Sequence, residues 1–188
     1  QEEHENHQLA ENANHTEKKE ITEKEKPAEV PASEAEPAGA GQENALALNL
    51  DFTENSRMSW PVQGNILLDY SMDSTIYFPT LDQYKCNPGM VIQGDISEPV
   101  YAPANARVVS VGNSEEIGTY LTLDLGNEYS VVCGQLKEVA AVEGEYLEKG
   151  QLMGYVAEPT KYYTVEGSNL YLEMLHKDSP VDPLDYLE

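Results

Sequence analysis

A succession of short segments in which apolar and polar residues alternate constrains the fold of this chain more than any other feature. No stretch of comparable length has a helical period. The expected strands are 66–70, 91–93, 100–102, 107–111, 120–125, 129–136, 151–156 and 170–175. Gly126-Asn127 joins two strongly alternating runs and predicts an antiparallel hairpin. The sequence therefore predicts an all-β fold, a compact antiparallel β-sandwich or barrel-like domain.

Two longer segments between the expected strands, 71–79 and 158–168, are rich in tyrosine and are predicted to be loops. Tyrosines of this kind serve as interface anchors, and they are equally common as half-buried residues of β-proteins. The sequence leaves both interpretations open for Tyr70, Tyr77, Tyr84, Tyr162 and Tyr163.

The first 57 residues have a different composition. Glu, Lys, Ala, Pro and Asn dominate, and no aromatic residue precedes Phe52. Such a segment buries too little apolar area to offset its ordering entropy. We expect residues 1–57 to form a disordered acidic tether and residues 58–188 to form the domain. Residues 46–52 alternate weakly and are either a short docking strand or the end of the tether.

The formal net charge of -23 limits the partners. A phosphate backbone or an anionic lipid surface would be repelled, so we expect no nucleic-acid partner. No apolar run is long enough to span a bilayer, and the chain begins at Gln1 rather than Met. We therefore expect an exported product that reached a membrane only through an N-terminal anchor that has been removed.

Five segments resemble a known family in their order and spacing. They are Trp60-Pro61-Val62-x-Gly64, Pro99-Val100-Tyr101-Ala102, Val142-x-Gly144-x-x-Leu147-x-x-Gly150-Gln151-x-x-Gly154, Gly167-Ser168-Asn169-Leu170-Tyr171-Leu172-Glu173 and Val181-Asp182-Pro183-Leu184-x-Tyr186-Leu187. From Trp60 onward the chain resembles the lysostaphin-type (LytM-like) zinc metallopeptidases, which cleave peptide cross-links in bacterial peptidoglycan. The resemblance implies a LytM-type fold, built on a duplicated hybrid motif.

The same resemblance indicates which residues stand at the catalytic positions. That family uses a His-x-x-x-Asp pair and the second His of a His-x-His strand as zinc ligands, and a His in a Tyr-x-His-Leu motif for proton transfer. These motifs align with Asn87 and Val91, with Asn169 and Tyr171, and with Gln135. None of the five side chains binds zinc well or titrates near neutral pH. The resemblance thus implies an inactive copy without metal or cofactor, whose remnant groove is either reused for binding or filled by packing.

Two further sites remain open from the sequence. Cys86 and Cys133 both lie beside former catalytic positions, and an exported chain favours disulfides, so a bond between them is conceivable. Asp95, Glu173 and His176 form a weaker alternative, a replacement metal site that no ligand spacing supports.

The leading functional prediction is a non-catalytic, extracytoplasmic binding module. Inactive relatives in this family pair with a membrane-anchored partner in spore formers or activate cell-wall amidases. We expect a cell-envelope protein partner rather than peptidoglycan, because anionic wall polymers would repel an acidic domain. The alternative is an active zinc endopeptidase with unusual ligands. A biotinyl or lipoyl carrier, suggested by residues 100–109 and 142–154, is disfavoured because the hairpin tip at Gly126-Asn127 has no lysine.

Overall fold

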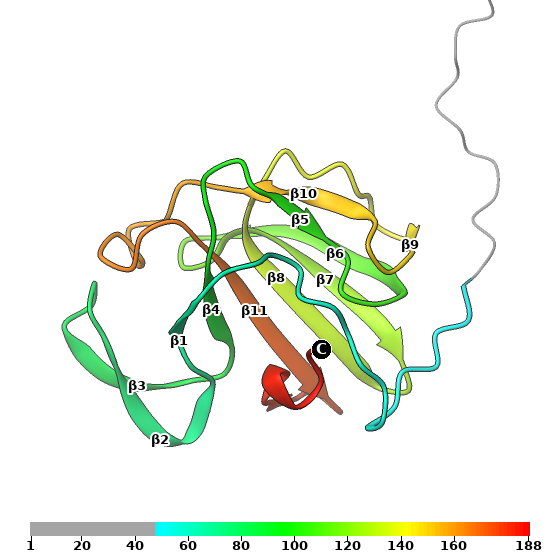
Figure 1. Ribbon diagram of the computed structural model, residues 1–188, viewed down its shortest axis with the longest axis horizontal. Helices are drawn as coiled ribbons and strands as arrows, with labels where there is room; N and C mark the ends of the chain where they lie inside the picture. Colours follow the sequence, from blue (N-terminus) through cyan, green and yellow to red (C-terminus); the bar gives the residue numbers. More distant parts are fainter. Residues whose placement is uncertain (1–47) are drawn as a thin grey trace, which may run out of the picture. The chain divides into compact units, whose positions relative to one another are not determined.

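The computed structural model describes residues 48–188, and within them the fold is all-β, as expected (Figure 1). The strands are β1 (Ile66–Leu68), β2 (Ser71–Phe78), β3 (Gln83–Asn87), β4 (Met90–Gln93), β5 (Pro99–Tyr101), β6 (Ala106–Ser114), β7 (Gly118–Gly126), β8 (Tyr129–Lys137), β9 (Tyr146–Leu147), β10 (Leu152–Val156), β11 (Asn169–His176) and β12 (Ser179–Val181). One 3-10 turn, η1 (Pro183–Asp185), follows them. In this part of the chain no helix has the length and apolar character needed to cross a membrane.

The main sheet has the strand order β1-β4-β11-β8-β7-β6-β9, and its neighbouring strands are antiparallel. β11 runs through the middle of this sheet, between β4 and β8. β5 and β10 pair with each other, and β10 also pairs with β8. β2 and β3 form a separate two-stranded sheet, which stands beside the main sheet at the left of Figure 1.

The two faces of the main sheet contribute to two different hydrophobic clusters, because successive side chains of a strand point to opposite faces. On β11, Leu170, Leu172 and Met174 belong to the larger cluster, which also contains residues of β5, β9 and β10. Tyr171, between them, belongs to a smaller cluster with Val91 of β4. We call the first side the core face and the second side the outer face.

The β7–β8 hairpin confirms the turn expected at Gly126-Asn127. Gly126, Asn127 and Glu128 all have positive φ, the backbone conformation that tight hairpin turns require. Gly126 has a second constraint, since a Cβ atom there would overlap the carbonyl oxygen of Leu50. The N-terminal part of the described chain therefore lies directly against this hairpin.

Residues 48–57 belong to the folded domain, so the expected tether boundary at residue 57 is wrong. The backbone N–H of Phe52 donates to the Leu125 carbonyl at 3.3 Å, and the Asn127 side chain donates to the Phe52 carbonyl at 3.1 Å. The Phe52 ring is buried in the larger cluster. No strand forms over residues 48–52, and residues 1–47, the rest of the tether predicted for residues 1–57, lie outside the described part of the chain.

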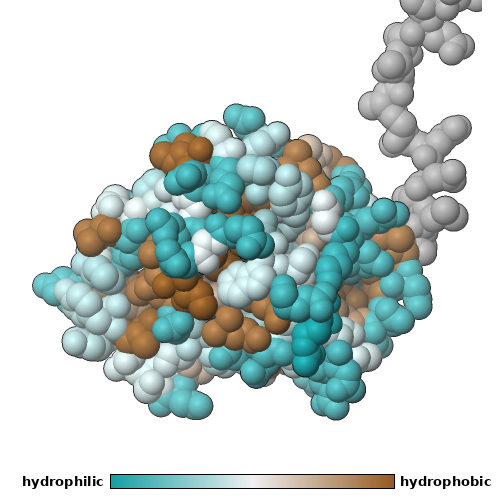
Figure 2. Space-filling model, in the orientation of Figure 1, coloured by the Kyte–Doolittle hydropathy of each residue, from teal (hydrophilic) through white to brown (hydrophobic). Residues whose placement is uncertain are grey.

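The loop predicted over residues 71–79 is also wrong, because β2 occupies most of it and pairs with β3, a strand that the sequence did not suggest. Most β2 side chains are exposed, so the segment lacks the apolar alternation that reveals a half-buried strand. At its end, Phe78 is buried in the smaller cluster. Hydrophobic surface gathers beside this hairpin on the face shown in Figure 2, among mostly hydrophilic residues.

Candidate functional site

The outer face of the sheet holds three of the five residues that the resemblance aligns with the family's catalytic positions. Asn169 and Tyr171 are two residues apart on β11 and share that face. Tyr171 lies opposite Val91 on β4 and opposite Gly134 on β8, next to Gln135. The strand pairing therefore brings these positions close together.

Val91, which the resemblance aligns with a zinc-binding aspartate, is completely buried. Its neighbours in the smaller cluster are apolar or aromatic: Leu68, Phe78, Tyr163 and Tyr171. A valine has no lone pair to offer a metal, and the surrounding cluster is a close-packed apolar interior. This position cannot be a ligand site.

Tyr171, which the resemblance aligns with a zinc-binding histidine, is 5% exposed. Its hydroxyl donates to Oε2 of Glu173 at 2.9 Å. Burial first, and then the nearby Glu173 carboxylate, raises the pKa of the Tyr171 phenol well above its ordinary value. A Cβ atom at Gly89 would come within 2.8 Å of Cζ of the Tyr171 ring, so the ring packs directly on this glycine.

Asn169 and Gln135 are both buried and point their amides at nearby loops. The Asn169 Nδ2 donates to the Gly167 carbonyl at 2.7 Å, while its Oδ1 is buried without a partner. Gln135 has a φ of 63° within β8, and its Oε1 accepts from the backbone N–H of Thr160 at 3.3 Å. Both amides therefore serve to hold the 158–168 segment.

Asn87 ends β3 at the edge of a hollow of about 340 Å³. Its Nδ2 donates to the Asp69 carbonyl at 2.9 Å. The hollow is lined by Lys85, Asn87, Pro88, Ser114, Glu116, Ile117, Tyr171 and Glu173. Two of the five predicted groove residues, Asn87 and Tyr171, thus line an open space, whereas Val91, Gln135 and Asn169 are outside its lining. The remnant groove is partly filled and partly open.

Several residues of the hollow were not singled out from the sequence. Glu173 was considered only for the alternative metal site, although the period of two along β11 places it on the same face as Tyr171. Lys85 and Glu116 form an ion pair at 2.9 Å although they are 31 residues apart. No motif or spacing in the sequence predicts that pair.

The two cysteines are free, which contradicts the disulfide considered from the sequence. Cys133 lies on the core face of β8, opposite Leu172, and is fully buried in the larger cluster. Cys86 is exposed on β3, in the separate two-stranded sheet. The bond would need the two Cα atoms within about 7 Å and side chains that point toward each other.

The alternative metal site of Asp95, Glu173 and His176 is not assembled. The His176 ring stacks on Tyr129 with centroids 4.1 Å apart, and Glu173 accepts from Tyr171 instead. Nowhere in residues 48–188 are three or more His, Cys, Asp or Glu side chains placed to hold a metal ion. The five residues that the resemblance aligns with the family's catalytic positions do not fit zinc either, since they supply three amides, an alkyl group and a protonated phenol.

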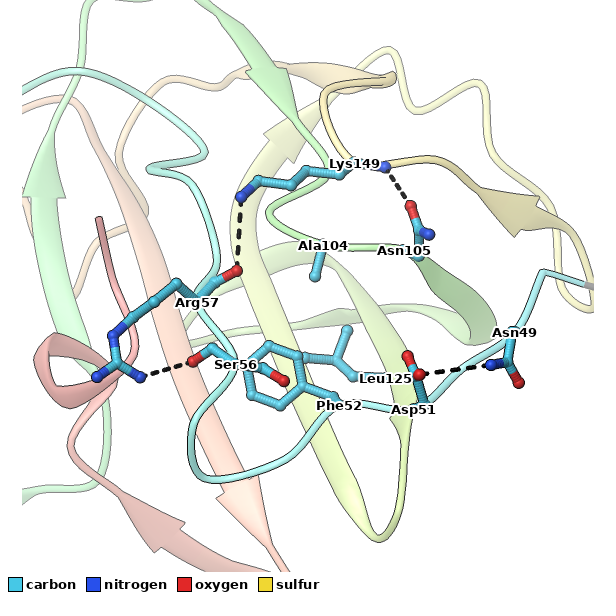
Figure 3. A pocket seen from close by; sticks show the side chains of 9 residues that line it. All are labelled: Asn49, Asp51, Phe52, Ser56, Arg57, Ala104, Asn105, Leu125 and Lys149. Atoms are coloured by element: carbon cyan, nitrogen blue, oxygen red, sulfur yellow. Dashed lines mark hydrogen bonds between the residues drawn. The ribbon is translucent and has the colours of Figure 1, made fainter.

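A second hollow, of about 200 Å³, lies where the N-terminal segment packs on the sheet (Figure 3). Lys149 crosses its rim and donates through Nζ to the Arg57 carbonyl at 3.4 Å and through its backbone to Asn105 Oδ1 at 2.9 Å. This hollow shares no residue with the first and contains none of the five predicted positions. Its contacts hold the N-terminal segment in place.

Solved structures with a similar fold include Helicobacter pylori Csd3, at 19% identity and a TM-score of 0.58, over 71% of this chain and 35% of that chain. Another is a chain of the SpoIIQ–SpoIIIAH pore forming complex, at 17% identity and a TM-score of 0.60, over 71% of this chain and 92% of that chain. A third is LytU, at 18% identity and a TM-score of 0.52, over 64% of this chain and 82% of that chain. The present chain thus spans about a third of Csd3. No curated protein matches the sequence.

These likenesses establish the fold, and a sequence profile supplies the family. The profile of peptidase family M23 matches residues 85–183, which is more than half of the chain. The matched region begins at Lys85 and runs through β11, so it contains all five positions discussed above. The chain therefore belongs to peptidase family M23.

Proposed function

We propose that this protein is a catalytically inactive, extracytoplasmic module of the M23 family that binds a protein of the cell envelope, in wall remodelling or sporulation. The observation that carries the proposal is the burial of Val91 in a dry cluster with Tyr171 at two positions where the family binds zinc. Hydrolysis by a zinc-bound water needs three protein ligands and an open coordination position. The side chains present here offer neither.

Two observations favour a protein partner over peptidoglycan. The chain has a formal net charge of -23, which opposes close approach to anionic wall polymers. One fold relative was solved as part of the SpoIIQ–SpoIIIAH complex, so this fold can serve as one side of a protein assembly. An acidic surface with an open hollow suits a partner that presents basic groups.

The absence of hydrolysis can be tested with the full chain. After incubation with zinc and dialysis, elemental analysis should find far less than one zinc per chain, and purified sacculi should release no cross-link peptides. An active lysostaphin-type peptidase, treated in parallel, serves as the positive control. Stoichiometric zinc together with peptide release would instead establish an endopeptidase with unusual ligands.

Partner binding needs a separate experiment. The full chain, immobilised by its N-terminus, is exposed to detergent-solubilised envelope proteins, and co-sedimentation with sacculi is measured at the same ionic strength. We expect saturable capture of a specific envelope protein and no co-sedimentation. Co-sedimentation without protein capture would transfer the binding role to peptidoglycan. The absence of both protein capture and co-sedimentation would contradict a binding role altogether.

A further inference from the structure

The hollow of about 340 Å³ has a composition that its structural role does not explain. Three parts of the chain build it: the end of β3 with Lys85 and Asn87, the β6–β7 turn with Glu116, and β11 with Tyr171 and Glu173. These segments are distant in sequence and meet only on the outer face of the sheet. A hollow that had merely lost its metal could close with apolar side chains, as the neighbouring position of Val91 has done.

The polar atoms at the wall are mainly hydrogen-bond acceptors. Asn87 is 2% exposed and uses its Nδ2 on the Asp69 carbonyl, while its Oδ1 accepts no hydrogen bond from any residue in 48–188. Among the described residues, Asn169 Oδ1 is the one side-chain polar atom that is both fully buried and without a partner. Asn87 Oδ1 has no partner either, so it must be accessible to a small molecule. Because Asn87 lines the hollow, this free acceptor belongs to a residue that a bound group would contact.

The charges at the wall do not balance. Lys85 Nζ lies 2.9 Å from Glu116 Oε1 and compensates that carboxylate. Glu173 accepts the neutral Tyr171 hydroxyl and has no cationic partner within the described residues. Burial keeps that phenol protonated. One negative charge therefore remains at the wall, beside the free Asn87 oxygen.

Apolar surface completes the wall. The buried Tyr171 ring belongs to the smaller cluster, and the partly buried Ile117 side chain packs against that cluster. Both line the hollow together with Pro88. Such a wall can receive an aliphatic chain, while the acceptors and the uncompensated carboxylate receive a cationic end. A divalent metal fits less well, because one of the two carboxylates, that of Glu116, is already paired with the Lys85 ammonium.

We propose that this hollow receives the cationic side chain of a lysine or arginine from the protein partner, held by Glu173 and Asn87 with its aliphatic stem against Ile117. The identity of the donor as a partner protein rests on the function proposed above, but the affinity of the hollow for the cation does not. The recognised group is an ammonium or guanidinium on an aliphatic stem.

The test uses the isotope-labelled full chain and two small probes, Nα-acetyl-lysine N-methylamide and the same compound with an acetylated Nε. Amide NMR shifts of Lys85, Asn87 and Ile117 should saturate with the cationic probe and weaken as salt is added. The neutral probe should leave them unchanged. Equal shifts with both probes, or no saturable shift with either, would overturn the inference.

Three single variants should change the affinity for the cationic probe in different directions. Glu173→Gln keeps an acceptor for the Tyr171 hydroxyl but removes the charge, and should lower the affinity for the cationic probe about fivefold. Lys85→Met keeps a side chain of similar length but removes the ammonium that lies over Phe78 and competes for the site, and should tighten binding of the probe by a similar factor. Glu143→Gln removes an exposed charge elsewhere and should change nothing. Equal effects of Glu173→Gln and Glu143→Gln would overturn the inference.

The partner experiment separates this inference from the proposed function. If the wild-type chain captures an envelope protein and Glu173→Gln captures it equally well, the partner binds elsewhere and the hollow is not its receptor. If the probe binds but no envelope protein is captured, the hollow is a cation site and the proposed function fails.

Discussion

The two faces of β11 differ in what they tolerate. On the core face, Leu170, Leu172 and Met174 are completely buried and apolar. On the outer face, Tyr171 closes a dry cluster and Glu173 borders a charged hollow. The difference teaches that the core face maintains the fold, whereas the outer face of the same strands carries side chains of very different chemistry.

The largest effect should come from restoring an acidic residue to the dry part of the outer face. Val91→Asp places a carboxylate in a fully buried apolar cluster and should lower the free energy of unfolding by about 4 kcal/mol at neutral pH. Urea unfolding measures it, with Val91→Ala as the control for lost packing, at about 2 kcal/mol. If the aspartate is no worse than the alanine, this part of the face is hydrated and can still admit a ligand.

Neighbouring residues of β11 compare the two faces directly. Leu172→Ala removes a fully buried side chain from the core face and should cost about 3 kcal/mol of unfolding free energy. Tyr171→Phe keeps the ring but loses the hydroxyl bond to Glu173, and should cost about 1 kcal/mol or less. A larger loss for Tyr171→Phe than for Leu172→Ala would contradict the division into a structural and a variable face.

Alkaline pH should weaken the fold through its phenols. Burial raises the pKa of Tyr171 above its ordinary value of 10.0, and burial with the Tyr129 hydrogen bond raises the pKa of Tyr186 to about 12. Below about pH 10 both the folded and the unfolded chain keep these protons. Above it the unfolded chain loses them first, so stability falls as the pH rises toward 12.

Unfolding free energies measured between about pH 8 and about pH 11 check this expectation. Tyr171→Phe should make the decline in stability shallower, because one of the phenols with a raised pKa is then absent. A stability that stays level through this range would mean that water reaches the phenol of the outer face.

The smallest effect concerns reactivity rather than stability. Burial raises the pKa of the Cys133 thiol to about 12, and this residue lies on the core face, whereas Cys86 is exposed. Alkylation of the native chain without reductant should add one group, detected by mass, and Cys86→Ser should abolish it. Addition of none would indicate a disulfide, and addition of two would indicate that the core face opens.

The strands with a clear period of two were predictable, and the outer hairpin was not. The hairpin of β7 and β8 follows from strong alternation and the Gly126-Asn127 turn. β2 is exposed along most of its length, so its pattern does not differ from that of a polar loop. The docking of Phe52 could not be read either, because a single aromatic residue after an acidic stretch does not show what it packs against.

The candidate site divides in the same way. The five positions were predicted from the resemblance and its motif spacing, and for Val91 the side chain alone excludes metal binding because an alkyl group has no lone pair. Which of them still faces open space depends on contacts with distant segments. Asn87 borders the hollow, while Asn169 and Gln135 turn toward the 158–168 segment.

The sequence by itself determined the all-β fold and which side chains stand at the positions that the resemblance aligns with zinc ligands, because strand periodicity and side-chain chemistry are local properties of the chain. The tertiary structure alone decided that Val91 is sealed in a dry cluster, that Cys86 and Cys133 are separate, and that Lys85 meets Glu116. These outcomes depend on packing between segments far apart in sequence. Side-chain pattern says which face a residue occupies, but the elements that cover this face determine whether it is buried, paired or open.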